Sequence, residues 1–225
     1  MKTQIYTMQS VEEALAVTNL GVDHLGLTPS NIGLPGEINN ETAKEIVAAV
    51  KGRATCVALS VDSNLDAIVD MVQAVTPDIL HLCGLDGALP PAEVLKLRKL
   101  LPGLPIMQAI SVTGPESIET ALAYQQISDY FILDTQAEDI AGIGASGLVH
   151  DWSVSRDLVE RVKIPVILAG GLSPENVAEA IQIVRPWAVD SLTHTNQSLP
   201  DGGFRKDLAR IQKFVAAAGK AASLL

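Results

Sequence analysis

Short β-rich runs alternate eight times with amphipathic helical segments along the 225 residues of this chain. Such alternation is typical of a parallel sheet that is covered by helices. The expected strands lie at 3–7, 22–28, 54–60, 78–83, 105–110, 129–134, 165–169 and 187–192. The expected helices lie at about 10–19, 40–51, 64–75, 91–101, 114–125, 153–163, 174–184 and 204–219. Eight repeats of strand and helix close more naturally into an α/β barrel, the (β/α)8 or TIM barrel, than into an open sheet.

The length of the chain suits one barrel domain over residues 1–225, and no low-complexity tract or linker marks a boundary within it. A doubly wound open sheet is the alternative fold. That alternative lacks support from a dinucleotide-binding motif, because no expected strand runs into a G-x-G-x-x-G helix start.

Charge and cysteine content restrict the partners and the compartment. A formal net charge of −10 argues against nucleic acid or an anionic membrane as partner. Cys56 and Cys83 are too few for a disulfide framework and indicate thiols in a reducing compartment. Neither a signal peptide nor a membrane span is expected, and no His or Cys spacing suggests a metal site. We therefore expect a cytoplasmic protein without metal or cofactor, with a homodimer left open.

The loops after the last two strands carry groups that bind phosphate. Gly170 and Gly171 follow the seventh strand and let the backbone approach a ligand closely. Thr193 and His194 follow the eighth strand in a run rich in hydroxyl and amide groups. Because the carboxyl ends of barrel strands form the active face, often with phosphate bound after strands seven and eight, we predict a phosphate site there.

A third loop, between Thr135 and Trp152, is too long for a plain connector and is expected to act as a functional lid. Its Gly144, Ser146 and Gly147 offer further backbone donors or hinges for the ligand. A flexible surface loop is the plainer alternative.

These motifs carry a family resemblance. ILDT (132–135), the glycine-rich loop, Asp151-Trp152 and PVILAGGLSPENVAEAI (165–181) resemble the phosphoribosylanthranilate isomerases of tryptophan biosynthesis. The resemblance implies a small phosphorylated sugar as partner and an Amadori rearrangement, in which an aldose amine becomes a ketose amine. It also implies a general acid at the end of the sixth strand, which here is Asp134. Such an acid needs surroundings that raise its pKa toward neutral pH.

The sequence departs from the family where the general base and the aglycone bind. The family's base cysteine, within Lys-Ile-Cys-Gly, falls on Tyr6, and a tyrosine with a pKa near 10 is a poor base at neutral pH. Cys83, Asp62 and His194 are candidate substitutes for this base. A family arginine that meets the anthranilate carboxylate after the second strand has no counterpart between Thr28 and Gly36.

Three functions remain open on the sequence alone. The first is a phosphoribosylanthranilate isomerase. The second is a divergent paralogue that isomerises another phosphosugar, and the third is a non-catalytic protein that binds a phosphometabolite.

Overall fold

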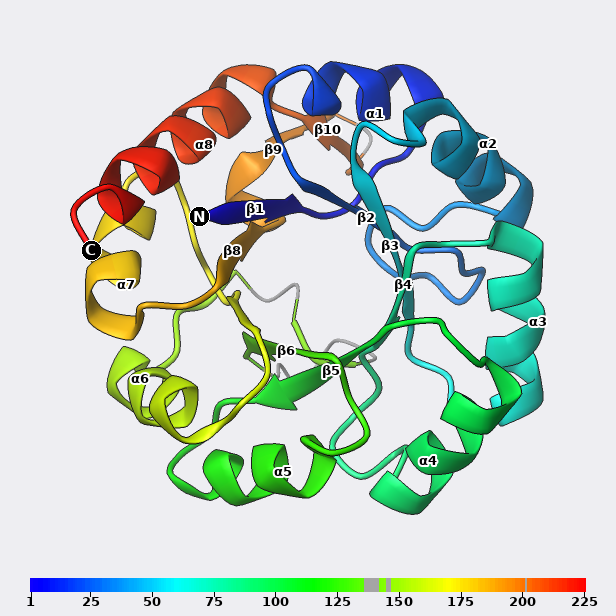
Figure 1. The fold of residues 1–225 in the computed structure, drawn as a ribbon. Helices are drawn as coiled ribbons and strands as arrows, with labels where there is room; N and C mark the ends of the chain where they lie inside the picture. Colours follow the sequence, from blue (N-terminus) through cyan, green and yellow to red (C-terminus); the bar gives the residue numbers. More distant parts are fainter. Residues whose placement is uncertain (136–141, 145–146, 201) are drawn as a thin grey trace.

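A computed structural model describes residues 1–135, 142–144, 147–200 and 202–225 of the chain. Eight parallel strands close into a barrel in chain order, with the helices on the outside (Figure 1). The barrel strands are β1 (Lys2–Ile5), β2 (His24–Leu27), β3 (Thr55–Ser60), β4 (Ile79–Leu82), β5 (Ile106–Ser111), β6 (Tyr130–Asp134), β7 (Val166–Leu168) and β8 (Ala188–Ser191). The predicted (β/α)8 barrel is confirmed.

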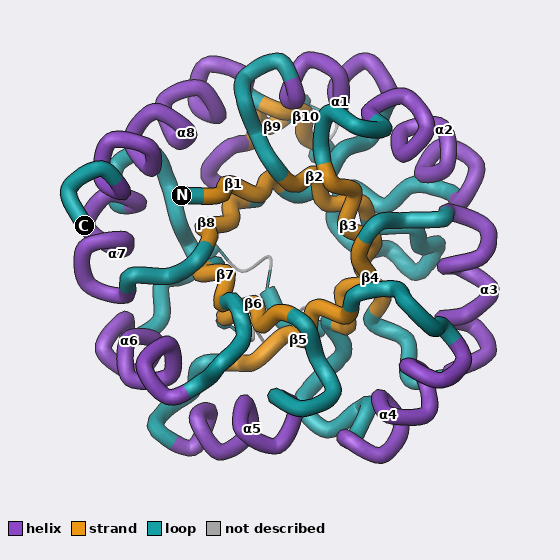
Figure 2. The backbone as a smooth tube through the Cα atoms, viewed as in Figure 1, coloured by secondary structure: helices purple, strands orange, loops and turns teal. Residues whose placement is uncertain are grey.

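The helices form a ring around the strands (Figure 2). They are α1 (Val11–Thr18), α2 (Asn40–Val50), α3 (Leu65–Val75), α4 (Pro91–Leu100), α5 (Glu116–Tyr124), α6 (Trp152–Arg161), α7 (Val177–Val184) and α8 (Leu208–Ala222). Several begin at a side chain that caps the first turn, as Asn64 does for α3 and Asp151 for α6.

Pairing between the first and the last strand closes the barrel. Ile5 of β1 is in register with Ser191 of β8 and with Leu25 of β2. All strands run in one direction, so the segments that follow them gather at one end of the barrel. This end is where the candidate site is built.

Side chains alternate between the barrel interior and the helix layer, as they must along a strand. On β6, Ile132 belongs to the inner cluster and Leu133 to the outer one. On β8, Ala188 belongs to the inner cluster and Val189 to the outer one. The next residue of each strand, Asp134 or Asp190, therefore faces the interior near the open end of the barrel.

Two helix starts differ from the prediction by three residues or more. The segment expected to begin a helix at 204 instead forms β10 (Phe204–Lys206), which pairs antiparallel with β9 (Asn196–Ser198) after the 3-10 turn η1 (Thr193–Thr195). Helix α8 starts only after Asp207, whose carboxylate accepts from Arg210 N at 3.0 Å.

The helix expected over 174–184 begins at Val177. A turn precedes it, in which Ser173 N donates to Asn176 Oδ1 (2.8 Å) and Ser173 Oγ accepts from Glu175 N (3.2 Å). Ser173 thus shapes the turn that leads into α7, and Asn176 is the residue adjoining the first helical position.

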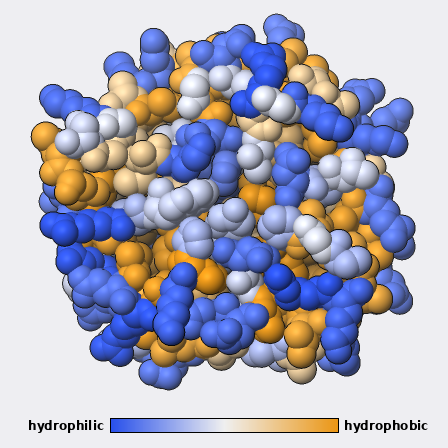
Figure 3. All heavy atoms as spheres, in the orientation of Figure 1, coloured by the Kyte–Doolittle hydropathy of each residue, from blue (hydrophilic) through white to orange (hydrophobic). Residues whose placement is uncertain are grey.

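The face seen in Figure 3 mixes hydrophilic residues, in blue, with scattered hydrophobic ones, in orange. Among the described residues, no helix combines the length and the apolar character that crossing a bilayer requires.

Candidate active site

A pocket opens at the C-terminal ends of the barrel strands and holds about 580 Å³ of empty space, counted to its open mouth. Its polar and ionisable lining residues are Tyr6, Thr7, Thr28, His81, Cys83, Asp134 and Asp190. Leu34, Pro35, Leu59 and Val61 contribute an apolar part of the wall.

Asp134, the last residue of β6, is positioned by its neighbours in the pocket wall. Its Oδ1 accepts from Thr135 N at 2.7 Å, and a Cβ built on Gly144 would lie 2.5 Å from Oδ2. Burial raises the pKa of Asp134 to about 7, although the hydrogen bonds from Thr135 act in the opposite direction. A carboxyl group with such a pKa can hold a proton at neutral pH and release it during a reaction.

Asp190 of β8 is a second carboxyl group in the same pocket, and sequence reasoning did not select it. Burial and the charge of Asp134 raise the pKa of Asp190 to about 8, whereas Gln4 and Lys206 act in the opposite direction. Its Oδ1 is buried and has no hydrogen-bond partner in the described part of the chain. The pocket therefore contains two carboxyl groups that exchange protons in the same pH range.

Tyr6 is a buried residue of the pocket wall. Its hydroxyl group lies 2.8 Å from His81 Nδ1, and burial raises the pKa of Tyr6 well above its ordinary value. Burial also lowers the pKa of His81 to about 3, so this imidazole is neutral. A neutral phenol bonded to a neutral imidazole forms a wall of the site and not a base at physiological pH.

Cys83, after β4, also lines the pocket and is buried. Its Sγ donates to Ile143 O at 2.8 Å, and burial, followed by the charge of Asp134, raises the pKa of the Cys83 thiol. The thiol is therefore protonated at neutral pH, which opposes a role as thiolate base.

A second pocket lies beside the first and holds about 270 Å³ of empty space. It is lined by Gly147, Gly170, Gly171, Thr193 and His194, together with Leu172, Ser191 and Leu192. Asp134 and Asp190 line both pockets, so they stand where the two meet. We call the residues 147, 170–172 and 192–194 the rim.

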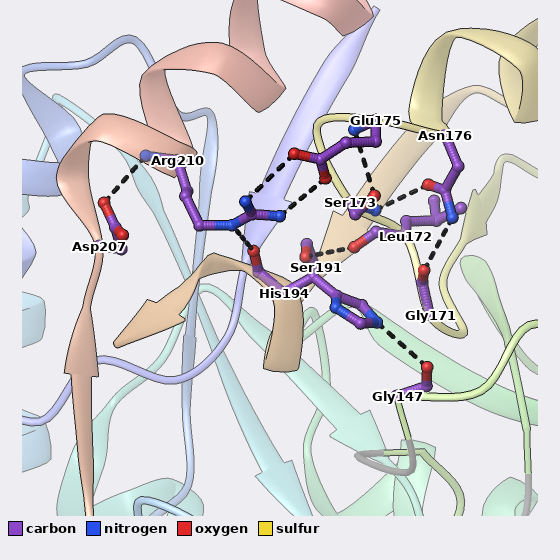
Figure 4. A network of polar contacts seen from close by, with 10 residues as sticks. All are labelled: Gly147, Gly171, Leu172, Ser173, Glu175, Asn176, Ser191, His194, Asp207 and Arg210. Atoms are coloured by element: carbon purple, nitrogen blue, oxygen red, sulfur yellow. Dashed lines mark hydrogen bonds and ion pairs between the residues drawn. The ribbon is translucent and has the colours of Figure 1, made fainter. Parts of the chain in front are cut away.

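Hydrogen bonds hold the carbonyl groups of the rim in place (Figure 4). Asn176 Nδ2 donates to Gly171 O at 3.0 Å, and Ser191 Oγ donates to Leu172 O at 2.7 Å. His194 Nε2 lies 3.1 Å from Gly147 O, which joins the loop after β6 to the segment after β8.

Arg210 of α8 supports the rim from behind (Figure 4). Its Nε donates to His194 O at 2.6 Å, and its guanidinium group pairs with Glu175 at 2.7 Å. The carbonyl of residue 194 and the start of α7 are thereby linked through one side chain.

The backbone amides of the rim are left without such partners. Within the described residues, N–H groups of Gly171, Leu172 and Thr193 have no hydrogen-bond acceptor in the protein. Backbone amides left free in this way, with the neighbouring carbonyl groups tied back, are typical of anion-binding sites.

The structure places the remaining site residues predicted from the sequence in different surroundings. Gly144 contacts Asp134, as described, whereas Ser146 lies outside the described residues. Asp62 accepts from Asn64 N at 2.8 Å in the turn before α3 and lines a neighbouring groove instead of the pocket. His194 lies in the rim and not beside Tyr6.

His150 was expected from the sequence near the pocket, without an assigned role, and it lies beside Asp134 and Gly170. A Cβ built on Gly170 would lie 2.8 Å from His150 Nδ1 and 3.3 Å from Asp134 Oδ1, so these groups crowd one corner. Its Nε2 bonds Ser155 Oγ at 2.7 Å, and burial lowers the pKa of His150 to about 4. In the described part of the chain, no group of three or more His, Cys, Asp or Glu side chains could hold a metal ion.

Fold and site together define a (β/α)8 barrel in which a rim of free backbone amides lies beside a pair of buried carboxyl groups. The sequence model of the N-(5'phosphoribosyl)anthranilate (PRA) isomerase family matches residues 3–217. The chain belongs to this family.

Individual relatives of the chain carry the same family name. An N-(5'-phosphoribosyl)anthranilate isomerase of Methanocella arvoryzae is 33% identical over 204 residues, 91% of each chain. N-(5'-phosphoribosyl)anthranilate isomerase 2 of Methanosarcina mazei is 34% identical and covers 96% of this chain and 92% of its own. The solved phosphoribosyl anthranilate isomerase of Thermotoga maritima is 26% identical, with a TM-score of 0.79 over 98% of this chain and 99% of its own.

A further solved structure is an isomerase of the same kind in complex with reduced 1-(O-carboxyphenylamino)-1-deoxyribulose 5-phosphate. It is 26% identical, with a TM-score of 0.77 over 98% of this chain and 99% of its own.

Proposed function

We propose that this protein isomerises a 5-phosphoribosyl amine from the aldose to the ketose form, with Asp134 as general acid and Asp190 as general base. The observation that carries the proposal is the pair of buried carboxyl groups between the pocket and the rim. Membership of the isomerase family supports the reaction type.

The reaction needs proton transfers at two sites of the sugar. Asp134 protonates the ring oxygen, the bond from C1′ to that oxygen breaks, and the nitrogen lone pair forms the C1′=N bond. Asp190 then removes the proton from C2′, which gives an enolamine. Proton loss from the C2′ hydroxyl group and protonation of C1′ complete the ketose, so no atom is gained or lost.

The pKa values of both carboxyl groups suit this work. Burial raises the pKa of Asp134 to about 7 and that of Asp190 to about 8, so near neutral pH one of the pair can donate while the other accepts. We assign the acid to Asp134, as the family resemblance implies. We assign the base to Asp190, the other carboxyl group of the pocket, which must first lose its proton to act as base because its pKa is the higher of the two.

Tyr6 and Cys83 are proposed to contact the substrate as part of the pocket wall. Both are neutral at physiological pH, because burial raises the pKa of each, and both side chains line the pocket. We assign them to shaping the cavity and keeping water away from the carboxyl pair, which strengthens electrostatic interactions there.

The substrate phosphate is proposed to bind at the rim. Gly171, Leu172 and Thr193 supply amides, and Gly147, Gly170 and His194 complete the wall. Gly144 is assigned to the close contact with Asp134, since a side chain there would displace the carboxylate. Binding phosphate at the rim would fix the sugar over the carboxyl groups.

A turnover assay tests the function. The purified protein would be incubated with the phosphoribosyl conjugates of aniline and of anthranilate, and ketose formation would be followed by NMR. We expect conversion of at least one conjugate and its loss in Asp134→Asn. Binding of a conjugate without turnover would instead support a non-catalytic phosphometabolite-binding protein.

The kind of partner, the cellular location and the oligomeric state are also proposed. A small phosphorylated sugar is the expected partner, and a cytoplasmic biosynthetic role accords with the family. A homodimer is proposed because the solved Thermotoga maritima enzyme is described as dimeric in its parent form. Sedimentation equilibrium, which gives the mass in solution, distinguishes dimer from monomer.

A further inference from the structure

Resting on the proposed isomerase function, we propose that Gln4 is a positioning residue for Asp190. Its side-chain amide, held in one orientation by His24, donates to the Asp190 carboxylate and favours the ionised form that accepts the proton from C2′. Neither Gln4 nor His24 is among the residues that line the pocket or the rim. Both would therefore act on the substrate only through Asp190.

The three side chains belong to neighbouring strands where the barrel closes. Gln4 of β1 is in register with Asp190 of β8 and with His24 of β2, and β1 lies between these two strands (Figure 2). Because side chains alternate along a strand, the neighbours of Gln4 show which way it faces. Ile5 belongs to the outer cluster and Tyr6 to the inner one, so Gln4 faces the barrel interior, as Asp190 does. All three side chains are buried.

His24 fixes one end of the Gln4 amide. Gln4 Oε1 lies 3.2 Å from His24 Nδ1, and an amide oxygen can only accept, so Nδ1 carries a proton. Burial lowers the pKa of His24; the charges of Asp23 and Asp78 oppose this effect, and that of Lys2 adds to it. The imidazole is therefore neutral at physiological pH, with its proton on Nδ1. The amide nitrogen of Gln4 is left to donate elsewhere.

Two buried atoms of this group lack hydrogen-bond partners in the described part of the chain, the donor Gln4 Nε2 and the acceptor Asp190 Oδ1. Buried polar atoms without partners are costly, so a small side-chain movement that joins the two would satisfy both. Gln4 already acts on Asp190 in this sense. Burial and the charge of Asp134 raise the pKa of Asp190 to about 8, whereas hydrogen bonding by Gln4 and the charge of Lys206 oppose the rise.

The orientation of the amide decides the sign of this effect. An amide N–H donor stabilises a carboxylate and lowers its pKa. A reversed amide would place Oε1 beside Asp190, and only the protonated carboxyl group could then form a hydrogen bond with it. His24 thus makes Gln4 a donor toward the proposed base.

Other ionisable groups near Asp190 must be kept apart from the effect of Gln4. Tyr6 and Cys83 are neutral at physiological pH, because burial raises the pKa of each. Asp134 titrates near pH 7. Lys206, whose Nζ donates to Tyr6 O, also has a pKa lowered to about 7 by burial. A measurement on Asp190 therefore has to remove Asp134 and leave Lys206 in place.

Carboxyl NMR measures the effect of Gln4 without any need for turnover. Full-length protein, isotope-labelled at the aspartate carboxyl carbons, is titrated in the Asp134→Asn background, and the Asp190 signal is identified by its loss in Asp190→Asn. We expect Gln4→Met to raise the titration midpoint of Asp190 by about one pH unit, since a hydrogen bond to a charged group is lost. An unchanged or lowered midpoint overturns the inference.

Gln108→Met is the matched control. Gln108 is also a buried glutamine in a barrel strand, but its amide donates to Ala109 O at 3.1 Å and it lines neither the pocket nor the rim. This substitution should leave the midpoint of Asp190 unchanged. Equal shifts in the two variants would show that the contact between Gln4 and Asp190 is not the cause, and would overturn the inference.

The orientation of the amide can be tested in the unsubstituted protein, so this arm does not depend on how a variant folds. Nitrogen NMR of the histidine rings, recorded above neutral pH, reports which nitrogen carries the proton. We expect Nδ1 of His24 to be protonated and Nε2 to be bare. The opposite pattern would make Nδ1 accept from the Gln4 amide, which turns Oε1 toward Asp190 and contradicts the proposal.

Turnover links the effect to the reaction. In the pH profile of kcat for the phosphoribosyl conjugate that the parent converts, Gln4→Met should move the acidic limb upward by about one pH unit, because Asp190 must lose its proton before it acts as base. A uniform loss of kcat at every pH would indicate a merely structural role and overturn the inference alone. Absence of turnover in the parent would overturn the proposed function and, with it, the catalytic role of Gln4, whatever the NMR titration shows.

Discussion

The ring of Tyr6 lies directly against the backbone of Gly26, so that a methyl group built at position 26 would come within 2.1 Å of Tyr6 Cδ1. We expect Gly26→Ala to lower the free energy of unfolding by about 1–3 kcal/mol, because the ring or the strand must shift. Denaturant unfolding measures the change.

Gly219→Ala is the matched control for this substitution. Gly219 lies in α8, and no atom lies within 4 Å of the position that an added methyl group would take, so alanine should stabilise the helix by about 0.5–1 kcal/mol. Equal effects of the two substitutions would contradict the close packing of Tyr6 on Gly26.

Loss of either carboxyl group should abolish most turnover. Asp134→Asn and Asp190→Asn should each lower kcat by about 10²–10⁴, since each removes one proton-transfer group. Asparagine at 134 can still accept from Thr135 N, so binding of a phenylamino product analogue should change little. Steady-state kinetics and calorimetry measure the two effects separately.

Asp66→Asn is the control, because Asp66 is an exposed residue near the start of α3. Full activity of Asp190→Asn would rule out its role as base and return attention to Cys83.

The buried carboxyl of Asp134 should make stability depend on pH. In the unfolded chain the Asp134 carboxyl group loses its proton near pH 3.8. In the folded protein it keeps the proton to about pH 7, because burial raises its pKa. Between these values the folded state binds more protons, so this group reduces stability as pH rises. Asp134→Asn should therefore become progressively more stable relative to the parent from pH 4 to pH 7.

Each unit of raised pKa corresponds to about 1.4 kcal/mol. Urea unfolding of both proteins across this pH range gives the difference. A constant difference would mean that the carboxyl titrates alike in the folded and unfolded chains.

Phosphate binding should depend on Gly171. Its φ is +63°, and an added Cβ would lie 2.7 Å from the carbonyl carbon of Leu148. Gly171→Ala should displace the rim and reduce the rise in Tm that inorganic phosphate causes in the parent, a rise that follows RT ln(1 + [L]/Kd).

Gly52→Ala controls for the cost of a left-handed backbone. Gly52 has φ +75° but no atom within 4 Å of the added Cβ, and it lies in a different pocket, near Lys2 and Asp23. Its phosphate response should match that of the parent, whereas an unchanged response in Gly171→Ala would argue that phosphate binds elsewhere.

Local patterns were sufficient to predict the barrel, and they place the predicted phosphate loops at one end of it. Gly170 and Gly171 end a strand that precedes a helix, and strand polarity in a barrel puts such loops at one end. The helix start at 204 was wrong because β10 forms by pairing with β9, a contact between segments that no local pattern reveals.

Asp190 was missed for a related reason. Strand β8 is buried on both faces, so its sequence AVDS has no polar alternation to indicate which side chains face the interior. Only the closed barrel brings Asp190 near Asp134. Departures at Tyr6 and after β2 were visible in the sequence, but the raised pKa that keeps Tyr6 neutral depends on burial and on the charges of Asp190 and Cys83, which only the folded barrel brings together.

Arg210 ties the last helix to the proposed anion site, since it bonds the backbone of His194 and pairs with Glu175. The proposed anion site would therefore be complete only once the C-terminal segment has docked on the rest of the barrel. A polypeptide still being synthesised that lacks α8 would lack the contact of Arg210 with the proposed phosphate site. Binding of the sugar phosphate would then require that the whole barrel has folded.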